Sequence, residues 1–129
     1  MTAVNVDLSI DQGSNFTVDI FVSNCGVKPD LTGYTFNAQI RKEFNSEDPA
    51  VGQFGITLKN QTTDRGGFTL SLPADISSAF EMDPPENPQE FTPTKFVYDI
   101  EWLPVGGDPD EDLETIIRGV ITVTPEVTK

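Results

Sequence analysis

The chain has 129 residues, of which 36% are hydrophobic, so it has the length of one domain with its own core. Its formal net charge of −13 argues against binding to nucleic acid or to an anionic membrane, because both would repel it. It contains no histidine, which excludes histidine-based nucleophilic triads and imidazole metal sites.

Cysteine content and the N-terminus bear on the compartment. Cys25 is the only cysteine, so no intramolecular disulfide can form. We interpret it as an ordinary reduced thiol, with an intermolecular bridge or a redox role as the alternative. No apolar run approaches the length of a membrane span, and the start MTAVNVDLSI lacks the pattern of a signal peptide. We therefore expect the chain to be made and kept in a cytosol.

Apolar and polar residues alternate repeatedly, which predicts short, half-buried strands. The first two predicted strands, 4–10 and 16–22, are joined by the turn sequence DQGS. A third, 34–41, follows the turn residues of PDLTG. The fourth and fifth, 54–58 and 68–72, flank NQTTDRGG and are predicted to form a hairpin.

The second half of the chain continues this pattern. PADISSAFE, which begins at Pro73, predicts the one short helical turn. The proline-rich acidic segment 81–94 is predicted to be a surface loop, and alternation resumes over 96–102. A second acidic loop, 104–115, precedes the last predicted strand, 117–123.

Gly119 lies inside that last strand and predicts a bulge or a close approach of backbone. About seven short strands with one helical turn predict an all-β fold, an immunoglobulin-like antiparallel β-sandwich that forms a single domain over 1–129. A jelly roll or a small barrel is the alternative.

Acidic residues at alternate positions form a weak calcium candidate in the second acidic loop. These residues are Asp108, Asp110, Asp112 and Glu114. Carboxylate oxygens of this kind bind calcium in many loops, although the spacing does not match an EF-hand. The alternative is a solvated acidic loop.

Two further carboxylates, Asp99 and Glu101, share one side of the predicted strand 96–102. A carboxylate pair is what a glycosidase needs, but acids on the solvent face of a strand are ordinary. Arg41 and Arg118 are placed to pair with nearby acids or to act as interface anchors, because arginine is enriched at hot spots.

Three aromatic residues complete the interface candidates. Phe44, Phe91 and Trp102 flank the loops and would form an apolar patch at one end of the sandwich, which would mark a partner contact. Packing at the edge of the core is the alternative for each.

Three sequence phrases resemble tailed-phage virion proteins. The first is PDLTGYTFNAQIRK, with Leu31–Thr35 at a turn and Gln39–Lys42 at the end of a strand. The others are FVYDIEW and the ending RGVITVTPEV. Together they resemble the immunoglobulin-like N-terminal module of upper-baseplate and tail-fibre attachment proteins, over nearly the whole chain. This chain differs from that module by carrying the acidic loop 81–94 in place of a brief turn.

The resemblance implies a structural part of a virion, made in the host cytoplasm, with no catalytic residues and no cofactor. The leading hypothesis is a non-enzymatic protein that docks to other virion proteins in the tail, baseplate or fibre-attachment region, in a multi-copy symmetric assembly. A capsid decoration or cement protein is the second hypothesis. A host-surface module that binds carbohydrate or calcium is the third.

Overall fold

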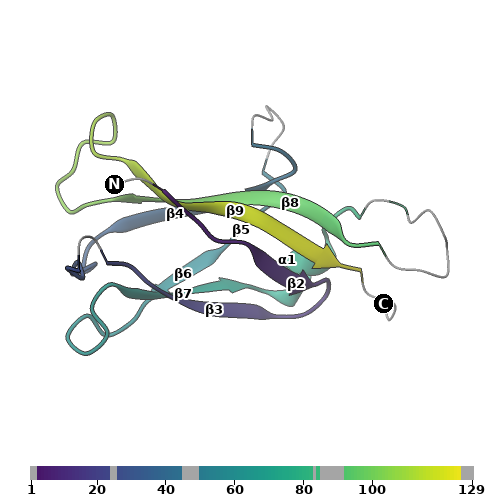
Figure 1. Cartoon of the computed structure of the whole chain (residues 1–129), viewed down its shortest axis with the longest axis horizontal. Helices are drawn as coiled ribbons and strands as arrows, with labels where there is room; N and C mark the ends of the chain where they lie inside the picture. The colour runs from purple at the N-terminus through teal and green to yellow at the C-terminus, as the bar shows by residue number, and fades with distance from the viewer. Residues whose placement is uncertain (1–2, 24–25, 45–49, 83, 85–91, 126–129) are drawn as a thin grey trace.

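Two β-sheets pack face to face in the computed structural model, which describes residues 3–23, 26–44, 50–82, 84 and 92–125 (Figure 1). The chain is an all-β sandwich, as its alternating pattern predicts.

The larger sheet contains most of the strands. These are β1 (Val4–Asn5), β2 (Leu8–Asp11), β4 (Thr35–Arg41), β5 (Gly52–Gln53), β8 (Thr94–Leu103) and β9 (Glu114–Thr124). Their order is β1-β9-β8-β4-β5, and β2 also pairs with β9. β8 buries every second residue from Thr94 to Trp102, so one of its faces meets the core and the other lies toward solvent.

The smaller sheet has the order β3-β7-β6, with β3 (Phe16–Phe21), β6 (Gly55–Leu58) and β7 (Gly67–Leu72). β6 and β7 pair in antiparallel fashion and confirm the predicted hairpin. The chain passes from the larger sheet to the smaller at Phe54, which is buried between β5 and β6.

The core lies between these sheets. Phe68 of the smaller sheet contacts Phe36 of the larger one at a ring distance of 5.2 Å, and Phe54 contacts Tyr98 at 5.7 Å. Large side chains such as Phe96 and Ile100 are at most 1% exposed. Burial of each such side chain contributes about 1.5–3 kcal/mol to the stability of the sandwich.

The first predicted strand is two strands in the structure, because the chain departs from the ladder at Val6 and Asp7. β1 and β2 both run parallel to β9 and keep the same register on either side of this break. Val6 N donates to Arg118 O at 2.9 Å, while Asp7 Oδ1 accepts a hydrogen bond from Val120 N at 3.0 Å. A side-chain acceptor thus replaces a backbone acceptor at this point.

Gly119 explains why the chain can come so close there. A Cβ atom at Gly119 would overlap the carbonyl oxygen of Val6, so no other residue fits without a shift of backbone. The close approach predicted from Gly119 is confirmed. The bulge is elsewhere, between Ile100 and Glu101 of β8 and their partners, and it leaves both Ile116 and Ile117 buried.

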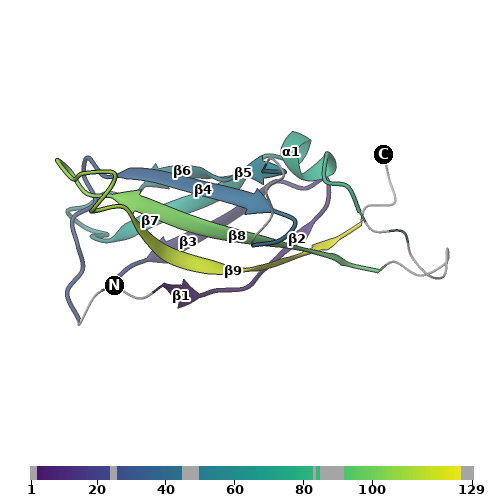
Figure 2. The same ribbon diagram turned by 90° about the horizontal axis from the view of Figure 1, so that it is seen from above.

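The one described helix, α1 (Ala74–Ser78), begins after Pro73 and lies at one end of the sandwich (Figure 2). Asn15 Oδ1 accepts a hydrogen bond from Ala74 N at 2.8 Å, and Ser77 Oγ accepts one from Gly13 N at 3.0 Å. The helical turn is therefore tied to the turn between β2 and β3.

Both acidic loops are shorter than the sequence predicts. β9 begins at Glu114, so the second loop ends at residue 113 instead of 115, and Thr94 is a buried residue of β8. The reason is that β8 and β9 pair over almost their full length, from Thr94–Val123 to Trp102–Glu114. Residues 83 and 85–91 of the first loop lie outside the described residues, as does Cys25.

Candidate functional site

The three sequence phrases lie on neighbouring strands. LTGYT precedes β4, whose end carries QIRK, FVYDIEW lies on β8, and RGVITVT lies on β9. Because β8 pairs with both β4 and β9, their outward residues form one continuous surface. We call this surface, formed by the solvent-facing residues of β4, β8 and β9, the outer face.

The turn before β4 is held by its own side chains. Asp30 Oδ1 accepts hydrogen bonds from Thr32 N at 3.0 Å and from Thr32 Oγ1 at 2.7 Å. Tyr34 N donates to Leu31 O at 3.0 Å, and Gly33 has a φ of 82°, which favours glycine. Leu31 is fully buried, so this turn fixes where β4 enters the sheet.

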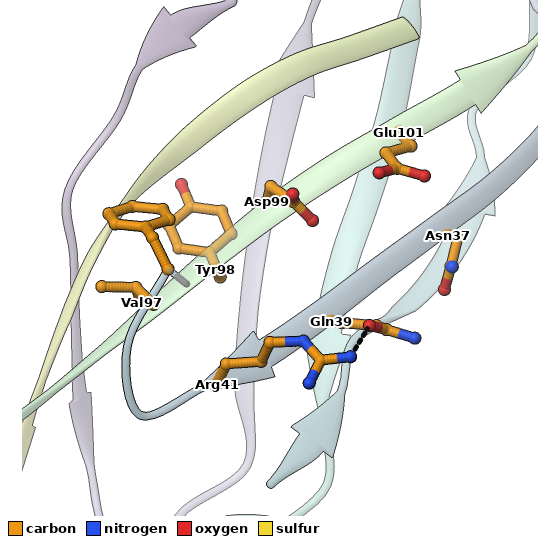
Figure 3. A pocket seen from close by; sticks show the side chains of 8 residues that line it. Asn37, Gln39, Arg41, Val97, Tyr98, Asp99 and Glu101 are labelled. Atoms are coloured by element: carbon orange, nitrogen blue, oxygen red, sulfur yellow. Dashed lines mark hydrogen bonds between the residues drawn. The ribbon is translucent and has the colours of Figure 1, made fainter. Parts of the chain in front are cut away.

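The outer face contains a shallow hollow of about 270 Å³ (Figure 3). Its lining residues are Asn37, Gln39, Arg41, Phe44, Val97, Tyr98, Asp99 and Glu101. Figure 3 shows the polar side chains of β4 and β8 along the two sides of this hollow, with Arg41 Nη2 donating to Gln39 Oε1 at 2.9 Å. Phe44 is 53% exposed at the rim. The hollow therefore combines polar groups with one exposed aromatic ring.

The carboxylates of the hollow are partly removed from water. Burial raises the pKa of the Asp99 carboxyl, and the charges of Arg118 and Arg41 oppose this rise without cancelling it. Burial, and secondarily the charge of Asp99, also raises the pKa of Glu101. Asp99 pairs in register with Gln39 on one side and with Arg118 on the other. A positively charged partner group placed here would offset the burial of both acids.

The structure brings three of the five predicted interface residues to this surface. Arg41 and Phe44 line the hollow, and Arg118 is exposed on β9 beside it. Phe91 lies outside the described residues.

Trp102 is placed differently. It is 6% exposed and packs against Tyr34 at 5.2 Å and Phe36 at 6.3 Å, between ring centroids. Trp102 is therefore a core residue and does not form part of an exposed apolar patch, because β8 places it on the same inward side as Ile100 and Tyr98.

In the second acidic loop, carboxylates accept hydrogen bonds from backbone N–H groups of the same loop. Asp112 Oδ2 accepts a hydrogen bond from Asp108 N at 2.8 Å, and Asp108 Oδ1 accepts one from Asp110 N at 2.9 Å. Glu114 belongs to β9 and is partly buried. Among the residues that the structure describes, no group of three or more potential ligands is arranged to hold a metal ion.

Sequence reasoning missed Asn37, Gln39 and Val97. All three occupy outward positions in the alternation of β4 and β8, so the signal was present in the sequence. What the sequence does not give is the pairing of β4 with β8, which places Asn37 opposite Glu101 and Gln39 opposite Asp99.

Neither protein-family models nor curated proteins gave a match to this chain. Within the described part of the chain, no helix has the length and apolar character needed to cross a membrane.

Proposed function

We propose that the protein is a non-enzymatic structural component of a phage virion, which docks through its outer face to other virion proteins in the tail, baseplate or fibre-attachment region. The observation that carries this proposal is the convergence of the three virion-like phrases on adjacent strands. Their outward residues place Arg41, Asp99 and Arg118 on one hollowed surface.

The chemistry of the outer face suits a protein partner. Arginine is enriched at interface hot spots, and Arg41 and Arg118 both act on the charge of Asp99. Phe44 adds an exposed ring at the rim. Charge interactions of this kind near the surface contribute little to stability while they are solvated, but they become specific once a partner excludes water.

We further propose that the sandwich is immunoglobulin-like. The order β3-β7-β6 matches strands B, E and D of that fold, and β4, β8 and β9 match C, F and G. The first strand differs from the constant-type arrangement, because β1 and β2 join β9 in parallel instead of extending the β3 sheet. An experimental structure with β2 paired to β3 would contradict the strand order on which this proposal depends.

Cryo-electron microscopy of the purified phage particle that encodes this chain tests the location. Density for the sandwich at the tail or baseplate is the expected result. Density on the head shell would instead favour a capsid decoration protein, and absence of the chain from the particle by mass spectrometry would overturn the virion proposal.

The role of the outer face is tested by incorporation of variants into particles. Arg118→Glu should lower incorporation at least about tenfold, as expected for loss of a hot spot. The matched control is Lys28→Glu, which makes the same charge change on an exposed residue between β3 and β4, outside the strands that form the outer face. Equal incorporation of the two variants would show that the outer face is not the docking surface.

A further inference from the structure

A second surface lies on the flank of the sandwich where β4 and β6 run close to each other (Figure 2). A groove of about 350 Å³ separates them. It is lined by Tyr34, Thr35, Phe36, Phe54, Ile56 and Leu58. We call it the flank groove; except for Thr35, its lining residues are apolar or aromatic.

Both ends of the flank groove are closed by the fold. At one end the chain crosses between the sheets, and Phe54 N donates to Ala38 O at 3.0 Å. At the other end Gln61 Oε1 accepts hydrogen bonds from Leu31 N and Gly66 N, each at 3.0 Å. The groove is thus a fixed slot between two strand edges, about the length of β6.

The backbone along this slot is free to pair. Lys59 N donates to Gly67 O, so alternation turns Thr57 toward β7 and leaves the N–H and C=O groups of Ile56 and Leu58 facing the flank. In β4, Ala38 O and Ile40 O accept hydrogen bonds from Phe54 N and Val51 N, so the backbone groups of these two residues face away from β8. Phe36 lies two residues before Ala38, and its backbone groups therefore face the same side, which is the flank of the groove. Across the ranges that the structure describes, no strand pairs with them.

These edges lack the usual protection against strand addition. Natural sheet edges carry charges or prolines that prevent pairing with other chains. β6 reads GITL and the unpaired start of β4 reads TFN, with neither a charge nor a proline. Lys59 directly follows β6, but its ammonium group reaches across the smaller sheet to Asp19 of β3, at 3.0 Å.

We propose that the flank groove receives an extended segment of a partner protein, which adds as a strand to β6 or β4 and inserts alternate apolar side chains into the slot. Strand addition uses main-chain hydrogen bonds for affinity and the slot for specificity. The net charge of −13 selects a basic segment and disfavours a second copy of this chain.

This inference names a mode of docking and therefore rests on the proposed docking function. It also supplies the second surface that a component needs if it is to link two different neighbours.

Binding of synthetic peptides to the purified protein tests the proposal. The probe is a short peptide that alternates lysine and valine, compared with a counterpart that has glutamate in place of lysine. Trp102 is the only tryptophan of the chain and contacts Tyr34 and Phe36, so its fluorescence should report occupation of the groove. We expect the lysine peptide to bind at least about tenfold more tightly than the glutamate peptide.

Variants at the rim locate the binding. Thr35→Lys places a positive charge on the exposed rim of the groove and should weaken the lysine peptide about tenfold, whereas Thr35→Glu should not weaken it. Thr17→Lys is the matched control, because it adds the same charge at an exposed position of β3. Circular dichroism and melting curves establish that the variants are folded.

Three outcomes would overturn the proposal: no binding of the lysine peptide, equal weakening by Thr35→Lys and Thr17→Lys, or a wild-type dimer that Thr35→Lys converts to a monomer. The last result would assign the groove to a second copy. None of them bears on the incorporation of Arg118→Glu into particles, so the two proposals fail separately.

Discussion

The two flanks of the sandwich are closed in different ways. On one flank, residues 4–11 run along β9 and occupy its edge as β1 and β2. On the other, β4 and β6 leave a slot that no described strand fills. The closed edge of β9 depends on particular residues, Asp7 and Gly119 among them. The edges of β6 and of the start of β4, on the open flank, carry only uncharged residues.

The closed flank depends on contacts that meet at Val6. Tyr98 Oη donates to the Val6 carbonyl at 2.6 Å, and Gly119 leaves the space that this carbonyl occupies. Asp7 then accepts the hydrogen bond of Val120 N. Residues distant in sequence thus combine to hold the N-terminal segment against β9. Substitutions of these residues should therefore lower the free energy of unfolding more than substitutions on the open flank do.

The largest effect is expected for Gly119→Ala. The added Cβ would overlap the Val6 carbonyl, so β1 must shift away from β9, at a cost of about 3 kcal/mol in the free energy of unfolding. Chemical denaturation measures this value. Gly106→Ala is the control, because nothing lies within 4 Å of its added Cβ and only its φ of 72° is unfavourable; it should cost about 1 kcal/mol. Equal losses of unfolding free energy in the two variants would mean that the close approach of Val6 to Gly119 does not contribute to stability.

Proline substitutions in β6 sharpen the comparison at the open flank. Thr57→Pro removes a hydrogen bond to β7, whereas Ile56→Pro removes an N–H that faces the slot. Measured relative to alanine at the same position, proline should cost about 2 kcal/mol more at Thr57 than at Ile56. Urea denaturation of the proline and alanine variants at Thr57 and at Ile56 gives the proline-minus-alanine difference in unfolding free energy at each position. A larger cost at Ile56 would show that its N–H is already paired in solution.

The next effect concerns Tyr98. Tyr98→Phe removes the hydrogen bond to Val6 O and should lower the free energy of unfolding by about 1–2 kcal/mol. Burial, with a smaller contribution from the charge of Asp7, raises the pKa of Tyr98 to about 12 from an ordinary value of 10.0. Because the folded pKa is the higher one, this contribution is fully present below pH 10 and is lost as the pH rises toward about 12.

Melting temperatures between pH 9 and pH 12 test the pH dependence. The wild type should lose stability over this range more steeply than Tyr98→Phe does, since the variant has no phenol to ionise at this position. Parallel curves for the two proteins would mean that Tyr98 titrates normally in the folded state.

The sequence predicts the sandwich well because alternation and turn residues act locally. Gly119 could be recognised as unusual inside a strand, which predicted a bulge or a close approach of backbone, but the sequence did not show that the approaching residue is Val6. The site could be predicted only in part. Arg41 and Phe44 were identified, but the hollow depends on which strands are neighbours, and Trp102 depends on which face of β8 meets the core. Which strands pair, and which face of a strand meets the core, are set by contacts between segments that are distant in the sequence. Local patterns do not specify these contacts.

The smallest effect is expected on the outer face, at Asp99. Its pKa is raised by burial against the opposing charges of Arg118 and Arg41, so its contribution to stability is present below its unfolded pKa and lost as the pH rises through the raised folded value. Asp99→Asn should therefore increase stability at pH 7 by about 0.5 kcal/mol, the scale of surface electrostatic effects, and this gain should vanish near pH 3.

Asp110→Asn makes the same charge change in the exposed loop and serves as the control. Denaturation at both pH values compares the two variants. If Asp99→Asn destabilises the protein at pH 7, the attraction of the two arginines outweighs burial even in the free protein. The carboxylate would then already be satisfied on the isolated sandwich, and a positively charged partner would gain less by binding there, which would weaken the assignment of the outer face as the docking surface.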